Sequence, residues 1–154
     1  MLICSTFDSP LGQLLIVADE EGVHKLQFLD KKCSPTISFG TNNTINQLKE
    51  ELTLYFSSKL FTFQTKVHLK GTPFQIQVLK SLQNIPFGKT LSYLEQAESI
   101  GRKEAVRAVA NANGKNLLAI IIPCHRVIHS KGGIGGYSSG IERKKWLLEH
   151  EKKL

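Results

Sequence analysis

The sequence predicts two consecutive units: a small α/β unit at residues 1–65 and a compact, mainly helical unit at residues 72–154, joined by a linker at residues 66–71. Runs of β-branched residues come first, one stretch with helical spacing follows, and the second half carries capping signals for several short helices. A chain of 154 residues, 41% hydrophobic and 21% charged, has room for one compact domain or two small ones.

Residues 2–30 predict a three-stranded meander. The first strand, Ile3–Phe7, ends at the turn Asp8-Ser9-Pro10. The second, Leu14–Ala18, ends at an acidic stretch closed by Gly22, and Val23–Leu29 alternates well enough for a third strand.

The rest of the first unit predicts a loop, a helix and a short strand. Residues 31–42 are polar and rich in turn residues, which indicates a loop. Residues 44–57 have helical periodicity, with Asn43 or Thr44 able to cap the helix. The apolar stripe of this helix consists of Ile45, Leu48, Leu52 and Tyr55. Phe61-Thr62-Phe63 is a short strand candidate.

The second unit predicts three helices in close succession. Thr72 is a suitable N-cap with Pro73 at the first helical position. After the turn Pro86-Phe87-Gly88, the sequence Ser92-Tyr93-Leu94-Glu95 matches a capping box. Gly101 ends that second helix. A third helix is expected from about Lys103 to Asn113, so the last two form a helix-turn-helix.

The third helix has an unusual outer face. Arg107 and Asn111 lie four residues apart, with Ala108 between them. Small residues around one projecting arginine allow close approach to another surface, such as a DNA groove, where the arginine could reach between bases. An amphipathic helix with a solvated arginine explains the same pattern.

A cysteine motif, Pro123-Cys124-His125-Arg126-Val127, directly follows the apolar run Ala119–Ile122. A thiol at the end of such a run is anchored on rigid backbone. Only the thiolate attacks, and the free thiol has a pKa of about 8.5. A nearby imidazole or positive charge raises the thiolate fraction near neutrality. The motif therefore predicts that Cys124 is a nucleophile.

Two features follow the motif. The glycine-rich stretch Lys131–Gly140 is either a flexible loop or a pocket wall where backbone approaches a flat ligand. Glu151 flanks the apolar face of the last helix, and it is either solvated or placed behind a histidine.

The three cysteines favour a reducing compartment. Cys4, Cys33 and Cys124 cannot all pair, and the sequence has no Cys-x-x-Cys. We expect Cys4 and Cys33 to be small buried or surface residues. A metal site formed by these two cysteines and His24 matches no standard zinc spacing, so we expect no metal.

The net charge of +7 favours a polyanionic partner, and the basic residues are concentrated in the second half. On charge alone, a basic protein without such a partner fits equally well. No apolar stretch approaches the ~20 residues of a membrane span. Met1–Ser5 lacks the basic region of a signal peptide, so we expect a cytoplasmic protein without a membrane partner.

Three groups of motifs resemble the O6-alkylguanine-DNA alkyltransferase family, also called methylated-DNA–protein-cysteine methyltransferases. They are Gly71–Gln75 with Ile85–Tyr93, Arg107–Val109 continuing to Asn116, and Ile122–Val127 with Gly136–Ser138 and Trp146–Glu151. They cover residues 71–151 with the family's spacing, and Asp8–Gly12 resembles the family more weakly. The resemblance implies a ribonuclease-H-like α/β domain followed by a winged-helix, helix-turn-helix DNA-binding domain that carries the active site.

The resemblance implies five catalytic residues. Cys124 would accept the alkyl group, His125 would act as base through a water, and Glu151 would orient His125. Asn116 would brace the turn that contains the nucleophile. Tyr93 would donate a proton or hydrogen bond to guanine N3, which makes the purine a better leaving group.

The resemblance also implies a set of residues that bind DNA and form the base pocket. These residues are Arg107, Ala108, Arg126, Val127, Tyr137 and Ser138. Arg107 would replace the extruded base in the duplex. Tyr137 and Ser138 would wall the pocket and contact O6, and the backbone of Val127 would accept from the guanine amino group.

The implied activity is direct-reversal DNA repair. The alkyl group of O6-alkylguanine, and of O4-alkylthymine, would pass irreversibly and once per protein molecule from duplex DNA to Cys124 after base flipping. We expect no cofactor and a prokaryotic monomer that binds DNA, with cooperative binding left open. Asp19 occupies a position where zinc-binding relatives need a cysteine, so no zinc is expected. The adaptive-response relatives' extra sensor domain is absent, so we expect no transcriptional control by self-methylation.

Three other functions compete with this interpretation. Alkyltransferase-like proteins bind damaged bases without repair, but they replace the cysteine that Cys124 provides here. A cysteine hydrolase normally brings its histidine from elsewhere in the sequence. A plain helix-turn-helix regulator leaves the motif at residues 123–127 unexplained.

Overall fold

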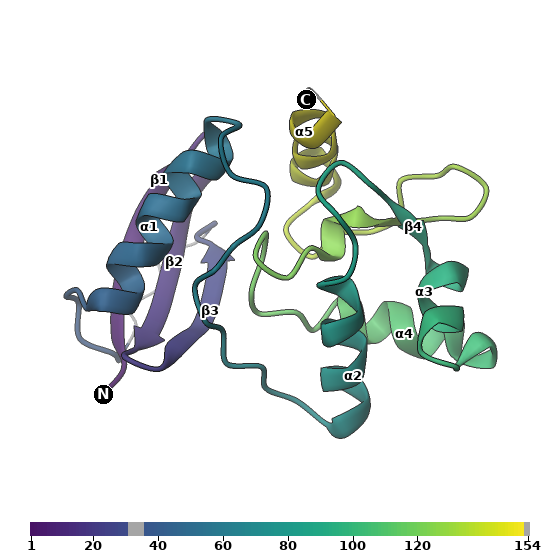
Figure 1. Cartoon of the computed structure of the whole chain (residues 1–154), viewed down its shortest axis with the longest axis horizontal. Helices are drawn as coiled ribbons and strands as arrows, with labels where there is room; N and C mark the ends of the chain where they lie inside the picture. The colour runs from purple at the N-terminus through teal and green to yellow at the C-terminus, as the bar shows by residue number, and fades with distance from the viewer. Residues whose placement is uncertain (31–35, 153–154) are drawn as a thin grey trace. The chain divides into compact units, whose positions relative to one another are not determined.

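The structure, a computed structural model, describes residues 1–30 and 36–152. The chain divides into two units, Met1–Leu69 and Lys70–Leu154 (Figure 1). Cys33 and the start of the predicted loop lie outside the described residues.

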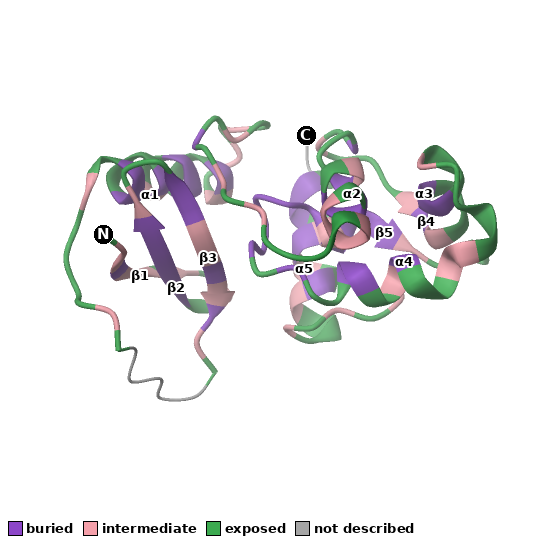
Figure 2. Ribbon diagram, turned by 90° about the horizontal axis from the view of Figure 1, so that it is seen from below, coloured by how far each residue is buried: buried purple, intermediate pink, exposed green. Residues whose placement is uncertain are grey.

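The first unit contains the predicted meander, an antiparallel sheet in the order β1-β2-β3. Its strands are β1 (Ile3–Ser9), β2 (Gly12–Asp19) and β3 (Gly22–Phe28). The central strand β2 is buried on both faces, since residues 14–18 are all buried (Figure 2). On one face, Leu15 and Val17 pack with Cys4 of β1.

Helix α1 (Asn43–Phe56) lies along the sheet, and its buried stripe is the predicted one (Figure 1). The N-cap differs from the prediction of Asn43 or Thr44. Asn42 caps the helix by accepting from the Ile45 amide at 2.8 Å, while its own amide donates to Ala18 O of β2 at 3.1 Å. The cap position is therefore selected by a contact with the sheet, which lies far away in sequence.

The predicted strand at residues 61–63 is absent, and bends occupy that stretch. The buried Glu51 carboxylate accepts from the amides of Gln64 and Thr65 at 2.7 and 2.9 Å, so a side chain, and not a sheet, satisfies this backbone. Pairing with β3 begins later, as a parallel bridge between Val23 and Val67. A second bridge joins Cys4 to Phe39 at the other edge of the sheet.

The second unit contains the three predicted helices, α2 (Pro73–Leu82), α3 (Tyr93–Ser99) and α4 (Val106–Asn113). Both predicted N-caps are confirmed, and each forms a full capping box. Thr72 exchanges hydrogen bonds with Gln75, and Ser92 does so with Glu95. The helices meet around a core of Val78, Ala97, Val109 and Ala112.

The turn between α3 and α4 confirms the helix-turn-helix and refines it. Gly101 has a φ of 70°, in the left-handed region that glycine adopts at low cost. The predicted third helix begins as a separate 3-10 turn, Lys103–Ala105, before α4. The reciprocal amide pair Gln96–Asn113 joins α3 to α4 through bonds of 2.9 and 2.7 Å.

Two short strands and a last helix complete the second unit. Strand β4 (Leu91–Ser92) pairs in parallel with β5 (Val127–Ile128), and α5 spans Ile141–Lys152. The two strands lie directly before α3 and directly after the cysteine motif, so the sheet links the motif to the helix-turn-helix. In the described part of the chain, no helix is long and apolar enough to cross a membrane.

The Gln96–Asn113 pair is expected to stabilise the second unit. Asn113→Ala leaves the fully buried Gln96 amide without its two bonds to Asn113 and should lower the free energy of unfolding by about 2 kcal/mol. Urea unfolding followed by the fluorescence of Trp146, the single tryptophan, measures this change. The exposed Asn111→Ala on the same helix is the control, and equal stability of the two variants would contradict the assignment.

Candidate functional site

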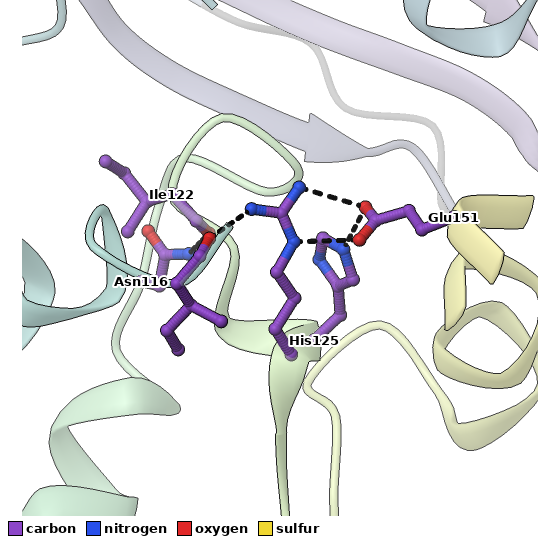
Figure 3. Close-up of polar contacts among 6 residues, drawn as sticks. Asn116, Ile122, His125 and Glu151 are labelled. Atoms are coloured by element: carbon purple, nitrogen blue, oxygen red, sulfur yellow. Dashed lines mark hydrogen bonds and ion pairs between the residues drawn. The ribbon is translucent and has the colours of Figure 1, made fainter. Parts of the chain in front are cut away.

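The residues before Cys124 form a buried turn and not an extended strand. Ile120 has a φ of 72°, a strained conformation for a β-branched residue. Asn116 holds this turn: its side-chain oxygen accepts from the Leu118 amide at 2.9 Å, and its amide donates to Ile122 O at 2.9 Å (Figure 3). The bracing predicted for Asn116 thus has a direct geometric basis.

The Asn116 amide also donates to Cys124 Sγ at 3.3 Å. Cys124 is half-buried and opens a 3-10 turn, Cys124–Arg126. Burial raises the pKa of the Cys124 thiol, and the Asn116 hydrogen bond and the charge of Lys144 oppose that rise. The thiolate form of Cys124 therefore depends on these neighbours.

His125 is fully buried, and its Nε2 lies 2.6 Å from Glu151 Oε2 (Figure 3). Burial raises the pKa of Glu151, but hydrogen bonds and charges from His125 and Arg126 outweigh it and hold that pKa well below its usual range. An ionised carboxylate only accepts, so His125 carries its proton on Nε2. Burial keeps the pKa of His125 below its usual value, which favours the neutral ring.

The other ring nitrogen of His125 is left as an acceptor. Nδ1 is buried and has no hydrogen-bond partner among the residues that the structure describes. A neutral imidazole with a free Nδ1 lone pair, next to the cysteine in sequence, can take up a proton from the thiol.

Arg126 differs from its predicted place in the base pocket. Its side chain is buried, donates from Nε to Glu151 Oε1 at 2.8 Å and from Nη1 to Ile85 O at 2.7 Å, and does not line the pocket described below. The tight 3-10 turn directs the cysteine and the arginine to different surroundings. The sequence shows that Arg126 is two residues from Cys124, but it does not show that its guanidinium binds the buried Glu151 carboxylate.

Lys144 is a site residue that sequence reasoning missed. Its side chain has no exposed surface, and its Nζ donates to Val127 O at 2.6 Å and to Gly136 O at 3.0 Å. Burial lowers the pKa of Lys144 to about 8, and the charge of Cys124 opposes this. The spacing Lys144, Leu147, Glu151 is i, i+3, i+7, which places all three on one helix face and could have identified the lysine.

A pocket of about 570 Å³ lies over the thiol and reaches α4. This volume is typical of small-ligand sites. Its lining residues include Cys124 and four other predicted site residues: Tyr93, Arg107, Tyr137 and Ser138. His129, Asn111 and Asn113 also line it and were not predicted.

The remaining predicted residues do not line the pocket. Asn116, His125, Val127 and Glu151 are buried, and Ala108 is exposed on α4 beside Arg107. The Val127 carbonyl already accepts from Lys144, so one of its two lone pairs is used. The glycine-rich stretch is a pocket wall, as one interpretation predicted: a Cβ on Gly135 would lie 2.9 Å from the Tyr93 hydroxyl.

The hydroxyl groups of the pocket are placed to act as donors. Burial, followed by the charge of Cys124, raises the pKa of Tyr93. Burial also raises the pKa of Tyr137, whose hydroxyl is buried and has no partner in the described part of the chain. Both phenols therefore stay protonated near neutrality and can donate hydrogen bonds to a flat polar ligand.

The first unit contains His24, one of the residues of the metal site weighed from the sequence. His24 Nε2 lies 2.9 Å from Asp19 Oδ2, and its ring stacks on that of His68 with centroids 4.5 Å apart. Within residues 1–30 and 36–152, no group of three or more His, Cys, Asp or Glu side chains could hold a metal ion.

Two family models match the chain. The first, described as "6-O-methylguanine DNA methyltransferase, ribonuclease-like domain", matches residues 2–69. The second, described as "6-O-methylguanine DNA methyltransferase, DNA binding domain", matches residues 73–153. They confirm the predicted order of an α/β unit followed by a DNA-binding unit.

Curated relatives and solved structures agree with these matches. A methylated-DNA–protein-cysteine methyltransferase of Methanosarcina barkeri is 43% identical over 94% of this chain and 94% of its own length. The structure of Mycobacterium tuberculosis O6-methylguanine methyltransferase has a TM-score of 0.90 at 40% identity and covers 99% of this chain and 93% of its own. That of Mycobacterium tuberculosis OGT in complex with DNA has a TM-score of 0.89 at 41% identity, covering 96% and 91%.

The charge of Lys144 is expected to favour the Cys124 thiolate. Lys144→Met removes that charge, raises the pKa of the thiol and should slow alkylation of Cys124 by iodoacetamide about tenfold at pH 7. Peptide mass spectrometry, which separates Cys124 from the other cysteines, measures the rate. The matched control is Lys145→Met, on the exposed side of the same helix. Equal rates in the two variants would contradict this role.

Proposed function

The chain belongs to the 6-O-methylguanine DNA methyltransferase family, and on this premise we propose that it repairs O6-alkylguanine in duplex DNA by transferring the alkyl group to Cys124. The observation that carries the proposal is the junction of two features in one pocket. Cys124 lines one side of this pocket, next in sequence to the buried His125–Glu151 pair, and the exposed outer face of α4 lines the other.

The transfer is a displacement at the alkyl carbon. The sulfur of Cys124 forms a bond to this carbon while its bond to guanine O6 breaks. The thiol proton passes to His125 Nδ1 through one water, and the ring keeps its other proton on Nε2 against Glu151. The departing purine takes up one proton from solvent, and His125 afterwards releases the thiol proton to solvent, so the net result is one proton moved from sulfur to the base.

The leaving group needs help because O6-alkylguanine is a weak electrophile. We assign this role to Tyr93, which lines the pocket and stays protonated, as a donor to guanine N3. Tyr137 and Ser138 lie in the same pocket and are proposed to contact the base and its O6. The family motif assigns the Val127 carbonyl to the guanine amino group, and this carbonyl is buried and accepts from Lys144.

The product explains why one molecule acts once. An S-alkyl cysteine is a thioether, which is neither a good leaving group nor readily hydrolysed. The thiol of Cys4 is buried in the core of the first unit, so it is not exposed to attack a thioether. The protein is therefore a stoichiometric reagent.

The alkyl carbon lies inside the base stack, so the nucleotide must be flipped out, at a cost of a few kcal/mol. Arg107 and Ala108 are exposed on α4, and Arg107 also lines the pocket. This position supports a role for Arg107 as the side chain that fills the gap left by the flipped base. The net charge of +7 supports binding to the DNA backbone.

Intact mass spectrometry after incubation with an O6-methylguanine duplex tests the transfer. We expect a gain of one CH2 per protein, saturating at one and mapping to Cys124. The variant Cys124→Ser should bind the duplex but gain no mass. Tight binding without any mass gain in the unmodified chain would reduce the protein to a damage-recognition module.

Arg107→Ala tests the insertion step separately from the chemistry. Loss of the side chain should slow methyl transfer from a duplex by roughly tenfold or more, because the flipped state loses its substitute for the missing base. Transfer from free O6-methylguanine base, which needs no flipping, should be unchanged. A similar slowing with both substrates would assign Arg107 to the pocket and not to the duplex.

A further inference from the structure

Arg126 is a buried cation, and it lies next to the proposed base without lining the pocket. All three nitrogens of its guanidinium donate hydrogen bonds, to two partner residues. Nε and Nη2 donate to the two oxygens of Glu151, at 2.8 and 3.2 Å, and Nη1 donates to Ile85 O at 2.7 Å (Figure 3). Such a fork fixes the plane of a carboxylate as well as its distance.

Glu151 is therefore shared. Its Oε2 receives His125 Nε2 at 2.6 Å and Arg126 Nη2 at 3.2 Å, while its Oε1 receives Arg126 Nε. The carboxylate cannot rotate away from the imidazole without breaking both bonds to the guanidinium.

Residues 85–88, in the turn between α2 and α3, also hold Arg126 in place. The guanidinium carbon lies 5.7 Å from the centre of the Phe87 ring, and Ile85 provides the carbonyl that accepts from Nη1. A Cβ on Gly88 would lie 3.2 Å from the Glu151 backbone oxygen, so this turn also packs closely on the end of α5. These contacts place Arg126 in a built site and not on a flexible surface.

The charges of the cluster determine which form of the base is stable. The groups that face His125 are Glu151 and Lys144 from α5 and Arg126 from its own 3-10 turn. With Arg126 present, the Glu151 carboxylate is already paired with a guanidinium and Lys144 adds a further positive charge, so protonating the ring would bury an unpaired positive charge. Without Arg126, the ring becomes the group that pairs with the buried carboxylate, so its protonation costs less.

We propose that Arg126 is a positioning residue that holds Glu151 in place and keeps His125 neutral, with its proton on Nε2 and its Nδ1 lone pair ready for the Cys124 proton. The proposal rests on the repair function proposed above. It assigns to Arg126 a role in preparing the base, in place of a contact with DNA or the flipped nucleotide. The Arg126 charge lowers the pKa of His125, in agreement with this role.

Arg126→Met and Arg126→Lys form the matched pair that tests the proposal. In Arg126→Met, the pKa of His125 should rise, so the acid limb of the pH–rate profile for single-turnover methyl transfer moves to higher pH. A shift of one unit should lower the rate about tenfold on the acid limb, below both pKa values, with a smaller loss at neutral pH and recovery at higher pH. Arg126→Lys keeps the charge and should keep the acid limb near its original position.

A purely structural role predicts a different result. Both variants would then lose a constant factor of rate at every pH, and a pH profile parallel to that of the unmodified chain would overturn the proposal. Lys145→Met, an exposed charge removal on α5, is the control and should leave the profile unchanged.

Nitrogen-15 NMR of the imidazole ring reads the protonation state without any DNA substrate. In the unmodified chain, His125 should be neutral at pH 7 with its proton on Nε2, and in Arg126→Met the protonation of Nδ1 should occur at a higher pH than in the unmodified chain. The signals are assigned by their loss in His125→Asn. An imidazolium in the unmodified chain at pH 7 would overturn the proposal even if Arg126→Met does not fold. If repair itself failed, this titration would still decide the role of Arg126.

Discussion

The carboxylate of Glu151 is the group on which the site depends. It is buried at the end of α5, and it binds the imidazole next to the nucleophile and the guanidinium one residue further on. Through Arg126 it is tied to the turn that precedes β4 and α3. A buried carboxylate is costly unless its lone pairs are filled, and here the partners that fill them also fix the base. One negative charge thus joins the last helix, the cysteine motif and the entry to the helix-turn-helix.

Arg126, Lys144 and His125 lie around the Glu151 carboxylate and the Cys124 thiol. They differ in whether they can gain or lose a proton. Arg126 is held by a fork and cannot lose its proton. Lys144 is held by two carbonyls, and its lowered pKa of about 8 leaves it close to titration near neutrality. His125 is neutral and has one nitrogen without a partner in the described part of the chain. In the proposed transfer, His125 is therefore the one of these three groups with a nitrogen left to accept the Cys124 proton.

Local signals in the sequence predicted the parts of the fold that local interactions determine. The capping boxes at Thr72 and Ser92 each lie within four residues, and the meander follows from alternation and turns. The failures involve contacts between distant residues. Glu51 satisfies the backbone of residues 64 and 65, where a strand was expected, and Asn42 was selected as cap by a bond to β2. The family motifs placed Cys124, Tyr93, Tyr137 and Ser138 around one pocket, but no pattern showed that Arg126 faces a carboxylate.

The two isolated bridges at the edges of the first sheet have a consequence for a protein that, as proposed, is used up by one transfer. Val67 covers part of the free edge of β3, and Phe39 does so for β1, so hydrogen bonds of the chain itself occupy groups that another strand would otherwise pair with. Exposed strand edges are where protein chains join into aggregates. A protein that cannot be regenerated is useful only while each molecule remains folded and unreacted. By covering parts of the sheet edges, these short bridges favour that folded, unaggregated form.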